Sequence, residues 1–170
     1  MTDWPEPVER VSAFLRAAAV DARIEEFSEG TPTAREAARA VGCELGQIVK
    51  SLVLVCDGAY VLALVPGDRR ADEDVVRAAV GAAEVRVAKA AEVVHATGFE
   101  PGGVAPFPQR AVTQTLMDTS FFAHEEVWVG AGSSSHMASL RPAELQKLSR
   151  AKSVDLGGTP SRIEPPRTGG

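Results

Sequence analysis

Hydrophobic residues recur at helical spacing near the start of the chain, where Val8, Val11, Leu15 and Ala19 form one apolar stripe with polar residues opposite. This pattern predicts a helix, and four shorter helical segments follow it along the chain. A Thr-x-x-Glu capping sequence begins the second of these helices, and a glycine ends it. The predicted helices span residues 8–20, 34–41, 72–80, 91–97 and 142–150.

Two long apolar runs in the first half of the chain predict a pair of buried strands. Residues 48–56 and 60–65 carry Val, Ile and Leu on both pleat faces, and Asp57-Gly58-Ala59 separates them. An Asp-Gly pair between such runs is typical of a β-hairpin, and apolar residues on both faces place the hairpin inside a sheet. Further strands are predicted at residues 24–27, 85–88, 112–117, 126–129 and 136–140.

The short helices and hairpin-joined strands together predict an α+β fold, a single domain with a mixed, mostly antiparallel β-sheet of about six to seven strands flanked by short helices. A chain of 170 residues corresponds to about one domain. Residues 1–156 are predicted to form this domain. Residues 157–170 contain seven Gly or Pro residues, so a disordered Gly/Pro-rich tail is expected there.

The charge balance limits the classes of partner. The chain has 18 Lys and Arg against 23 Asp and Glu, a net charge of −5, which argues against broad, charge-driven binding to nucleic acid or anionic lipid. No apolar run approaches the ~20 residues of a membrane span, and the first residues lack the pattern of a secretory signal. Two cysteines provide neither a disulfide framework nor metal-ligand spacing. We therefore expect a cytoplasmic protein without a metal, a membrane or DNA as its partner.

Lys50 interrupts the first long apolar run, on the same pleat face as Ile48 and Leu52. An ammonium buried without a partner costs several kcal/mol. The strand therefore either lets this lysine reach water at its end or keeps it for a ligand, and both readings stay open from the residue alone. Pleat alternation points the next side chain, Ser51, to the opposite face.

Residues 98–108 hold three glycines and three prolines in eleven positions, so they form no regular structure. Adjacent glycines let a backbone approach a ligand closely and direct consecutive N–H groups at an oxygen atom. The alternative is a rigid connector between a helix and a strand. The segment lacks the Gly-x-x-x-x-Gly-Lys sequence of a phosphate-binding loop, which excludes nucleotide hydrolysis by that mechanism.

His136 follows a run of small and hydroxyl residues that begins at Gly130 and includes Ser133. A Ser–His nucleophile pair is conceivable here, but the chain has no Gly-x-Ser-x-Gly elbow and no assignable acid partner. A lone histidine at a strand edge is the simpler reading of this segment.

The order of these signals along the chain is more specific than any one of them. The segments are Gln47-Ile48-Val49-Lys50, Thr97-Gly98, Pro101-Gly102-Gly103-Val104 with Pro106, Met117-Asp118, Gly130-Ala131-Gly132 and Leu140-Arg141-Pro142. In this order they resemble the YbaK/prolyl-tRNA-synthetase-associated domain family, the stand-alone editing deacylases that hydrolyse mischarged aminoacyl-tRNA. The resemblance covers nearly the whole predicted domain.

The resemblance implies a role for particular residues. Lys50, Gly102 and Gly103 correspond to the catalytic set, in which the glycine amides stabilise the developing oxyanion and the lysine charge anchors the terminal nucleotide or the ester carbonyl. The implied substrate-binding residues are Ser51, Thr97, Gly98, Pro101, Pro106, Asp118, Gly130, Gly132 and His136.

The implied function is trans-editing, the hydrolysis of a mischarged tRNA, with tRNA-Pro carrying a small wrong amino acid as the expected substrate and no cofactor required. The partner is then the acceptor end of the aminoacyl-tRNA, and a prolyl-tRNA synthetase or an elongation factor is a further candidate. Two alternatives remain at this point, a non-catalytic synthetase-associated binding module and a hydrolase of free small esters.

Overall fold

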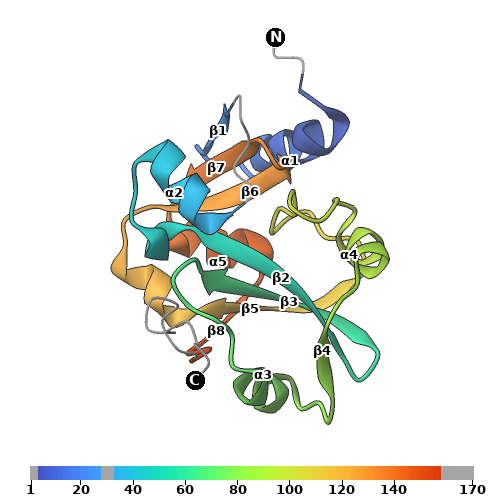
Figure 1. The fold of residues 1–170 in the computed structure, drawn as a ribbon. Helices are drawn as coiled ribbons and strands as arrows, with labels where there is room; N and C mark the ends of the chain where they lie inside the picture. Colours follow the sequence, from blue (N-terminus) through green and yellow to red (C-terminus); the bar gives the residue numbers. More distant parts are fainter. Residues whose placement is uncertain (1–3, 28–32, 158–170) are drawn as a thin grey trace.

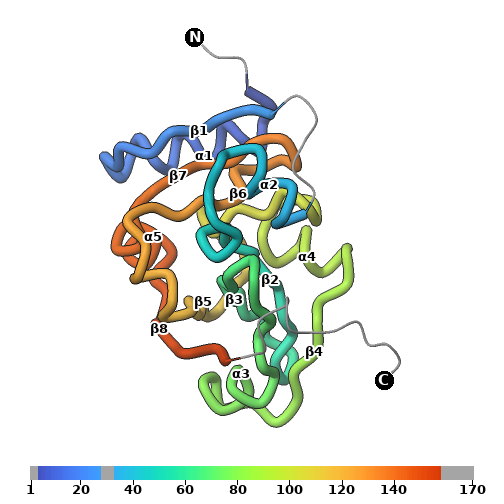
Figure 2. The backbone as a smooth tube through the Cα atoms, turned by 60° about the vertical axis from the view of Figure 1, so that its left-hand side comes forward, coloured from blue at the N-terminus to red at the C-terminus, as the bar shows by residue number. Residues whose placement is uncertain are grey.

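The computed structural model of the chain describes residues 4–27 and 33–157. The segment predicted to be a disordered tail lies outside the described residues from position 158 onward. Figure 1 shows two β-sheets with helices around them, and Figure 2 shows the smaller sheet and α1 at one end of the molecule, with α3 and β4 at the other.

The larger sheet has five strands in the order β4-β2-β3-β5-β8. β2 and β3 form the predicted hairpin, in which Asp57 and Gly58 adopt φ values of 51° and 84°. Positive φ at both central residues is the type I′ turn that suits the twist of a tight hairpin. β5 runs parallel to β3, and β8 runs parallel to β5. The strands are β2 Val49–Cys56, β3 Ala59–Pro66, β4 Val85–Val87, β5 Val112–Asp118 and β8 Lys152–Val154.

The smaller sheet has three antiparallel strands in the order β1-β7-β6. A single bridge between Ile48 and Trp128 joins it to the start of β2. Helix α1, Glu6–Ala17, lies along β6. The strands are β1 Arg23–Glu26, β6 Val127–Ser133 and β7 His136–Leu140.

The remaining helices are short, and their ends follow the sequence signals. Thr33 caps α2 by accepting a hydrogen bond from the Glu36 amide at 3.1 Å, and Gly42 ends this helix with φ of 74°. Because φ is positive there, glycine is the residue of lowest cost. The helices are α2 Ala34–Val41, α3 Glu73–Val80, α4 Ala90–Thr97 and α5 Pro142–Ser149, with 3-10 turns at Leu45–Gln47 and Thr119–Ala123.

The predicted α+β class and the mostly antiparallel strand pairing are confirmed. The described strands number eight and divide between two sheets, whereas the sequence predicted one sheet. The division arises because β6 and β7 pair with β1 and meet the larger sheet at one bridge alone. The prediction missed β8, a three-residue strand that pairs in parallel with the end of β5.

The two faces of β2 contact different parts of the core, and this arrangement positions the candidate site. Val49 and Val53 face the space between the sheets, where Phe99 of the glycine-rich loop and Val129 also pack. Leu52 and Leu54 face the opposite way and pack with Val76 of α3 and its neighbours.

Candidate functional site

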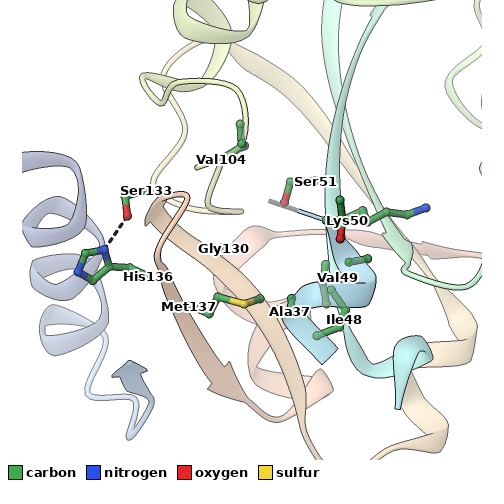
Figure 3. Close-up of a pocket in the computed structure, with 13 residues that line it drawn as sticks. Ala37, Ile48, Val49, Lys50, Ser51, Val104, Gly130, Ser133, His136 and Met137 are labelled. Carbon is green, nitrogen blue, oxygen red and sulfur yellow. Dashed lines mark hydrogen bonds between the residues drawn. The ribbon is translucent and has the colours of Figure 1, made fainter. Parts of the chain in front are cut away.

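A cavity of about 240 Å³ lies between the start of β2, the glycine-rich loop, the β6–β7 hairpin and the beginning of α2 (Figure 3). It is bounded by backbone as well as by small and apolar side chains, with hydroxyl and amide groups on its walls. The lining residues are Thr33, Ala34, Ala37, Ile48, Val49, Lys50, Ser51, Gly102, Val104, Gly130, Ser133, His136 and Met137.

Lys50 and Ser51 point to opposite sides of β2, as pleat alternation requires. The Ser51 hydroxyl is on the side of the glycine-rich loop (Figure 3), and its Oγ is buried without a hydrogen bond to any described residue. The ammonium of Lys50 turns away from Val104 and Gly130 and donates to the carbonyl oxygen of Arg69 at 2.8 Å. The hydroxyl therefore faces the cavity, whereas the charge lies at its edge.

The environment of Lys50 disfavours its charge without removing it. Burial lowers the pKa of the ammonium from its ordinary value, the nearby Asp68 carboxylate opposes this shift, and the positive charge of Arg70 adds to it. Lys50 therefore loses its proton at a lower pH than an exposed lysine would. The surrounding residues compensate the positive charge of Lys50 only in part. This charge is therefore suited to binding an anionic ligand.

His136 is 2% exposed, and Ser133 holds its ring. The Nδ1 atom lies 2.6 Å from Ser133 Oγ, which also accepts the Ser135 amide at 3.0 Å. The other ring nitrogen, Nε2, lies 3.8 Å from a Glu26 carboxylate oxygen and forms no hydrogen bond with the described residues. The indole of Trp4 packs against the ring edge at a centroid distance of 5.1 Å. The ring is therefore fixed in orientation, and it points toward α1 and away from the cavity (Figure 3).

The glycine-rich loop packs directly against the backbone of the β6–β7 hairpin. A Cβ atom at Gly130 would lie 2.6 Å from the Val104 carbonyl oxygen, and one at Gly103 would lie 2.7 Å from Ser133 Cα. Both approaches are closer than real Cβ atoms make, so these two glycines allow the contact. A Cβ at Gly102 would point into open space, although its φ of 91° favours glycine.

The amides of the two adjacent glycines have different surroundings. The Gly103 N–H donates to the Glu100 carbonyl at 2.9 Å and so closes a turn within the loop. Gly103 is absent from the cavity lining, whereas Gly102 is part of it. Of the two predicted oxyanion donors, Gly102 is the one placed to meet a ligand.

The cavity brings together Lys50, Ser51, Gly102, Gly130 and His136 from the predicted set. Around the loop, Thr97 Oγ1 donates to the Val93 carbonyl and accepts the Phe99 amide, at 2.8 and 3.0 Å. Gly98 ends α4 with φ of 81°. These residues shape the loop and do not line the cavity, and Pro101 is exposed on its surface.

The other predicted residues lie outside the cavity as well. Pro106 borders a different surface hollow together with Phe107 and Phe14. Asp118, 1% exposed, accepts amide hydrogens from Leu156 and Ser120 at 2.9 and 3.0 Å and so joins the end of β5 to the segment that follows β8. A Cβ at Gly132 would lie 2.7 Å from the Pro7 carbonyl, which shows that this glycine admits α1.

Sequence reasoning missed the wall that α2 provides. Thr33, Ala34 and Ala37 reach the cavity from a helix that is distant in the sequence from the loop and the hairpin. The capping pattern at Thr33 predicted the start of this helix, but nothing local shows where a helix start will pack. Met137 was missed for the same reason, since its strand register depends on the partner strand.

The fold and the site define a single α+β domain with a small, partly polar cavity beside a glycine-rich loop. The family model described as "Aminoacyl-tRNA editing domain" matches residues 28–148. The chain belongs to this family, which confirms the resemblance seen in the sequence and supports a role in aminoacyl-tRNA editing.

Relatives of known sequence and structure agree with this assignment. The chain is 32% identical over 130 residues to the uncharacterised protein YwhH of Bacillus subtilis, covering 76% of this chain and 82% of that protein. It is 31% identical over 133 residues to a proline–tRNA ligase of Xanthomonas oryzae, covering 76% of this chain but 24% of the ligase. A solved structure of a proposed trans-editing enzyme for prolyl-tRNA synthetase superposes with a TM-score of 0.85 at 34% identity, covering 92% of this chain and all of that one.

No helix among the described residues combines the length and the apolar character needed to cross a bilayer. No group of three or more His, Cys, Asp or Glu side chains is arranged there to hold a metal ion. The predicted cytoplasmic location stays a prediction.

Proposed function

We propose that this protein hydrolyses the ester bond of mischarged aminoacyl-tRNA in trans, with tRNA-Pro carrying a small wrong amino acid as its substrate. The observation that carries the proposal is the cavity between β2, α2 and the glycine-rich loop, in a chain that belongs to the editing family. Two of the relatives are a proline–tRNA ligase and a proposed trans-editing enzyme for prolyl-tRNA synthetase, and this supports the choice of tRNA-Pro.

The size of the cavity favours a small amino acid. Its volume of about 240 Å³ falls below the ~300–1,000 Å³ that is usual for sites of drug-sized ligands. Ala34, Ala37 and Gly130 form its walls, and the main chain of Val104 closes on Gly130. An aminoacyl group with a short side chain fits against these small walls.

The chemistry requires placement more than a strong nucleophile. Water adds to the ester carbonyl carbon, and the bond from this carbon to the ribose oxygen breaks. One proton of the water goes to the ribose oxygen, the other is released to solvent, and the amino acid leaves as a carboxylate. The Gly102 amide and the Ser51 hydroxyl are the donors proposed for the developing oxyanion, and the Lys50 charge at the cavity edge is proposed to hold the nucleotide.

Release of amino acids from a panel of mischarged tRNAs tests the proposal. We expect the purified protein to deacylate tRNA-Pro carrying a small amino acid at least tenfold faster than prolyl-tRNA-Pro, because differential fit in the cavity sets the rate. Aminoacyl-adenosine without a tRNA body is included to separate an editing enzyme from a hydrolase of small esters. Failure to release any amino acid while tRNA still binds would leave the non-catalytic binding module as the function.

Replacing Ser51 with alanine provides a second test, because the substitution is expected to lower the rate of deacylation without lowering the stability of the fold. Replacing Ser51 with alanine removes a buried hydroxyl that has no hydrogen-bond partner among the described residues. Such a group costs about 1–3 kcal/mol when it stays unsatisfied, so the melting temperature should hold or rise. If the hydroxyl contacts the substrate, kcat/KM for deacylation should fall about fivefold to tenfold.

The control for this variant is Ser153→Ala, in β8 at the other side of the larger sheet. It should leave deacylation within twofold of the wild type. A Ser51→Ala variant with wild-type kcat/KM would remove the hydroxyl from the proposed mechanism.

A further inference from the structure

Helix α1 contacts both ends of the glycine-rich loop, residues 98–108. At the start of the loop, the Arg10 guanidinium donates to the Gly98 carbonyl oxygen at 2.7 Å. At its end, the Phe14 ring stacks on the Phe107 ring, with the ring centroids 5.0 Å apart. Arg10 and Phe14 are four residues apart in the helix, so they lie on the same face of α1. One face of this helix therefore contacts the loop both where it begins and where it ends.

The contact at the start of the loop is made by a guanidinium that is itself held in place. Arg10 Cζ lies 4.7 Å from the centroid of the Phe99 ring, within the range of a cation–π interaction, and Phe99 is 1% exposed. Glu6, one turn earlier in α1, lies 3.3 Å from Arg10 Nε. A Cβ at Gly98 would lie 2.7 Å from a terminal nitrogen of Arg10, so a larger residue there would displace the guanidinium. Arg10 thus binds the backbone of one loop residue and the ring of the next.

The helix that makes these contacts is anchored on another wall of the cavity. Val8 and Val11 of α1 are completely buried, and α1 lies along β6. A Cβ at Gly132 would lie 2.7 Å from the Pro7 carbonyl oxygen, so the backbone of the helix touches the strand directly. Because α1 contacts both the loop and β6, it sets their separation, and the Gly102 amide lies in the loop between its two points of contact with α1.

Neither the family assignment nor the cavity gives Arg10 a role. α1 precedes residues 28–148, which are the ones that the family model matches. Arg10 is also absent from the lining of the cavity. An effect of this arginine on a reaction in the cavity must therefore pass through the loop.

From these contacts we infer that Arg10 is a positioning residue for deacylation, which acts through the glycine-rich loop. Its guanidinium holds the loop at Gly98 and Phe99 and so keeps the Gly102 amide directed at the cavity. The inference rests on the proposed function, because this amide is the proposed oxyanion donor. Such a donor acts through its exact placement, so a displaced loop lowers kcat and leaves the contacts that bind the tRNA intact.

Arg10→Met tests the inference, because methionine keeps an unbranched apolar stem but has no guanidinium. We expect kcat for deacylation to fall about tenfold, with KM for aminoacyl-tRNA within about twofold of the wild type. Arg10→Lys retains a donor for the Gly98 carbonyl, although it lacks the planar group that lies over Phe99. It should therefore recover part of the loss, to within about threefold of the wild-type kcat.

Amide hydrogen exchange measures the state of the loop without any substrate. The Gly103 N–H donates to the Glu100 carbonyl at 2.9 Å, so its exchange rate reports opening of the loop. We expect Arg10→Met to raise this rate at least tenfold more than the rate of the Leu62 amide in β3, a strand with a partner on each side. A uniform loss of stability would instead raise the exchange rate of Leu62 at least as much as that of Gly103.

Two other arginines provide matched controls. Arg16→Met removes an arginine of the same helix, whose guanidinium donates to Ser12 and Glu9 of α1 at 2.7 and 2.9 Å. Arg110→Met removes an exposed arginine whose guanidinium also approaches Gly98, at 3.1 Å from the position of a Cβ there. Both controls should keep kcat and the exchange rate of the loop within twofold of the wild type.

The outcomes separate positioning from stability, from charge and from the proposed function. An unchanged Gly103 exchange rate in Arg10→Met would overturn the inference, as would an equal fall in kcat for Arg16→Met. A raised KM with unchanged kcat in both Arg10→Met and Arg110→Met would mean that the two arginines bind RNA phosphates, which also overturns it. Faster Gly103 exchange in Arg10→Met, in a protein whose wild type releases no amino acid from any mischarged tRNA, would instead count against the hydrolysis.

Discussion

Replacing Lys50 with alanine is expected to lower the rate constant for deacylation at least tenfold, which corresponds to about 1.4 kcal/mol of transition-state stabilisation. Lys50 lines the cavity between β2, α2 and the glycine-rich loop, and its charge at the cavity edge is the one that the terminal nucleotide of a substrate would meet. Its ammonium is held by one carbonyl oxygen, that of Arg69, at 2.8 Å, so the charge is fixed in position. Single-turnover deacylation measures the effect.

The fold should survive this substitution. Burial already lowers the pKa of Lys50, and the lysine forms no salt bridge with the described carboxylates, so no opposite charge is left unpaired when it is removed. Circular dichroism and the melting temperature should stay close to those of the wild type. Lys152→Ala, which removes an exposed lysine from the far edge of the sheet, is the matched control. Near-wild-type turnover of Lys50→Ala would exclude its charge from the mechanism.

The central hairpin and the glycine-rich loop could be predicted from the sequence because their signals are local. β2 and β3 carry apolar residues on both faces and are separated by an Asp-Gly pair. This pattern predicts a buried hairpin without any knowledge of the other strands in the sheet. The glycines and prolines of residues 98–108 exclude regular structure by their backbone preferences alone. The alternation that places Lys50 and Ser51 on opposite faces is equally local.

The side of β2 on which the cavity forms could not be predicted in this way. Alternation separates Lys50 from Ser51, but the packing of the loop against Gly130 and Ser133 decides that Ser51 faces the glycine-lined cavity. The same holds for the wall contributed by α2 and for the turn that engages the Gly103 amide. Each depends on contacts between segments far apart in the chain, which no short pattern records.

Gly130→Ala is expected to reduce deacylation by about a hundredfold, since an error of ~1 Å in the placement of reacting groups can cost that much. The new Cβ would lie 2.6 Å from the Val104 carbonyl oxygen, so the loop that carries Gly102 must move away from β6. Overpacking of this kind costs about 1–3 kcal/mol. Because 1 kcal/mol corresponds to roughly 2–4 °C for a domain of this size, the melting temperature should fall by several degrees.

The control must destabilise the protein without moving the loop, and Gly58→Ala does so. Gly58 lies in the β2–β3 turn with φ of 84°, and a Cβ there meets no atom within 4 Å. Its alanine is strained by about 1–2 kcal/mol because the backbone is left-handed, so it should lower the melting temperature by a similar amount. Deacylation by Gly58→Ala should nevertheless remain within twofold of the wild type at a temperature where both variants are folded. If the two variants lose activity equally, the loss reflects stability alone; if Gly130→Ala keeps full activity, the close contact between the loop and β6 does not position the site.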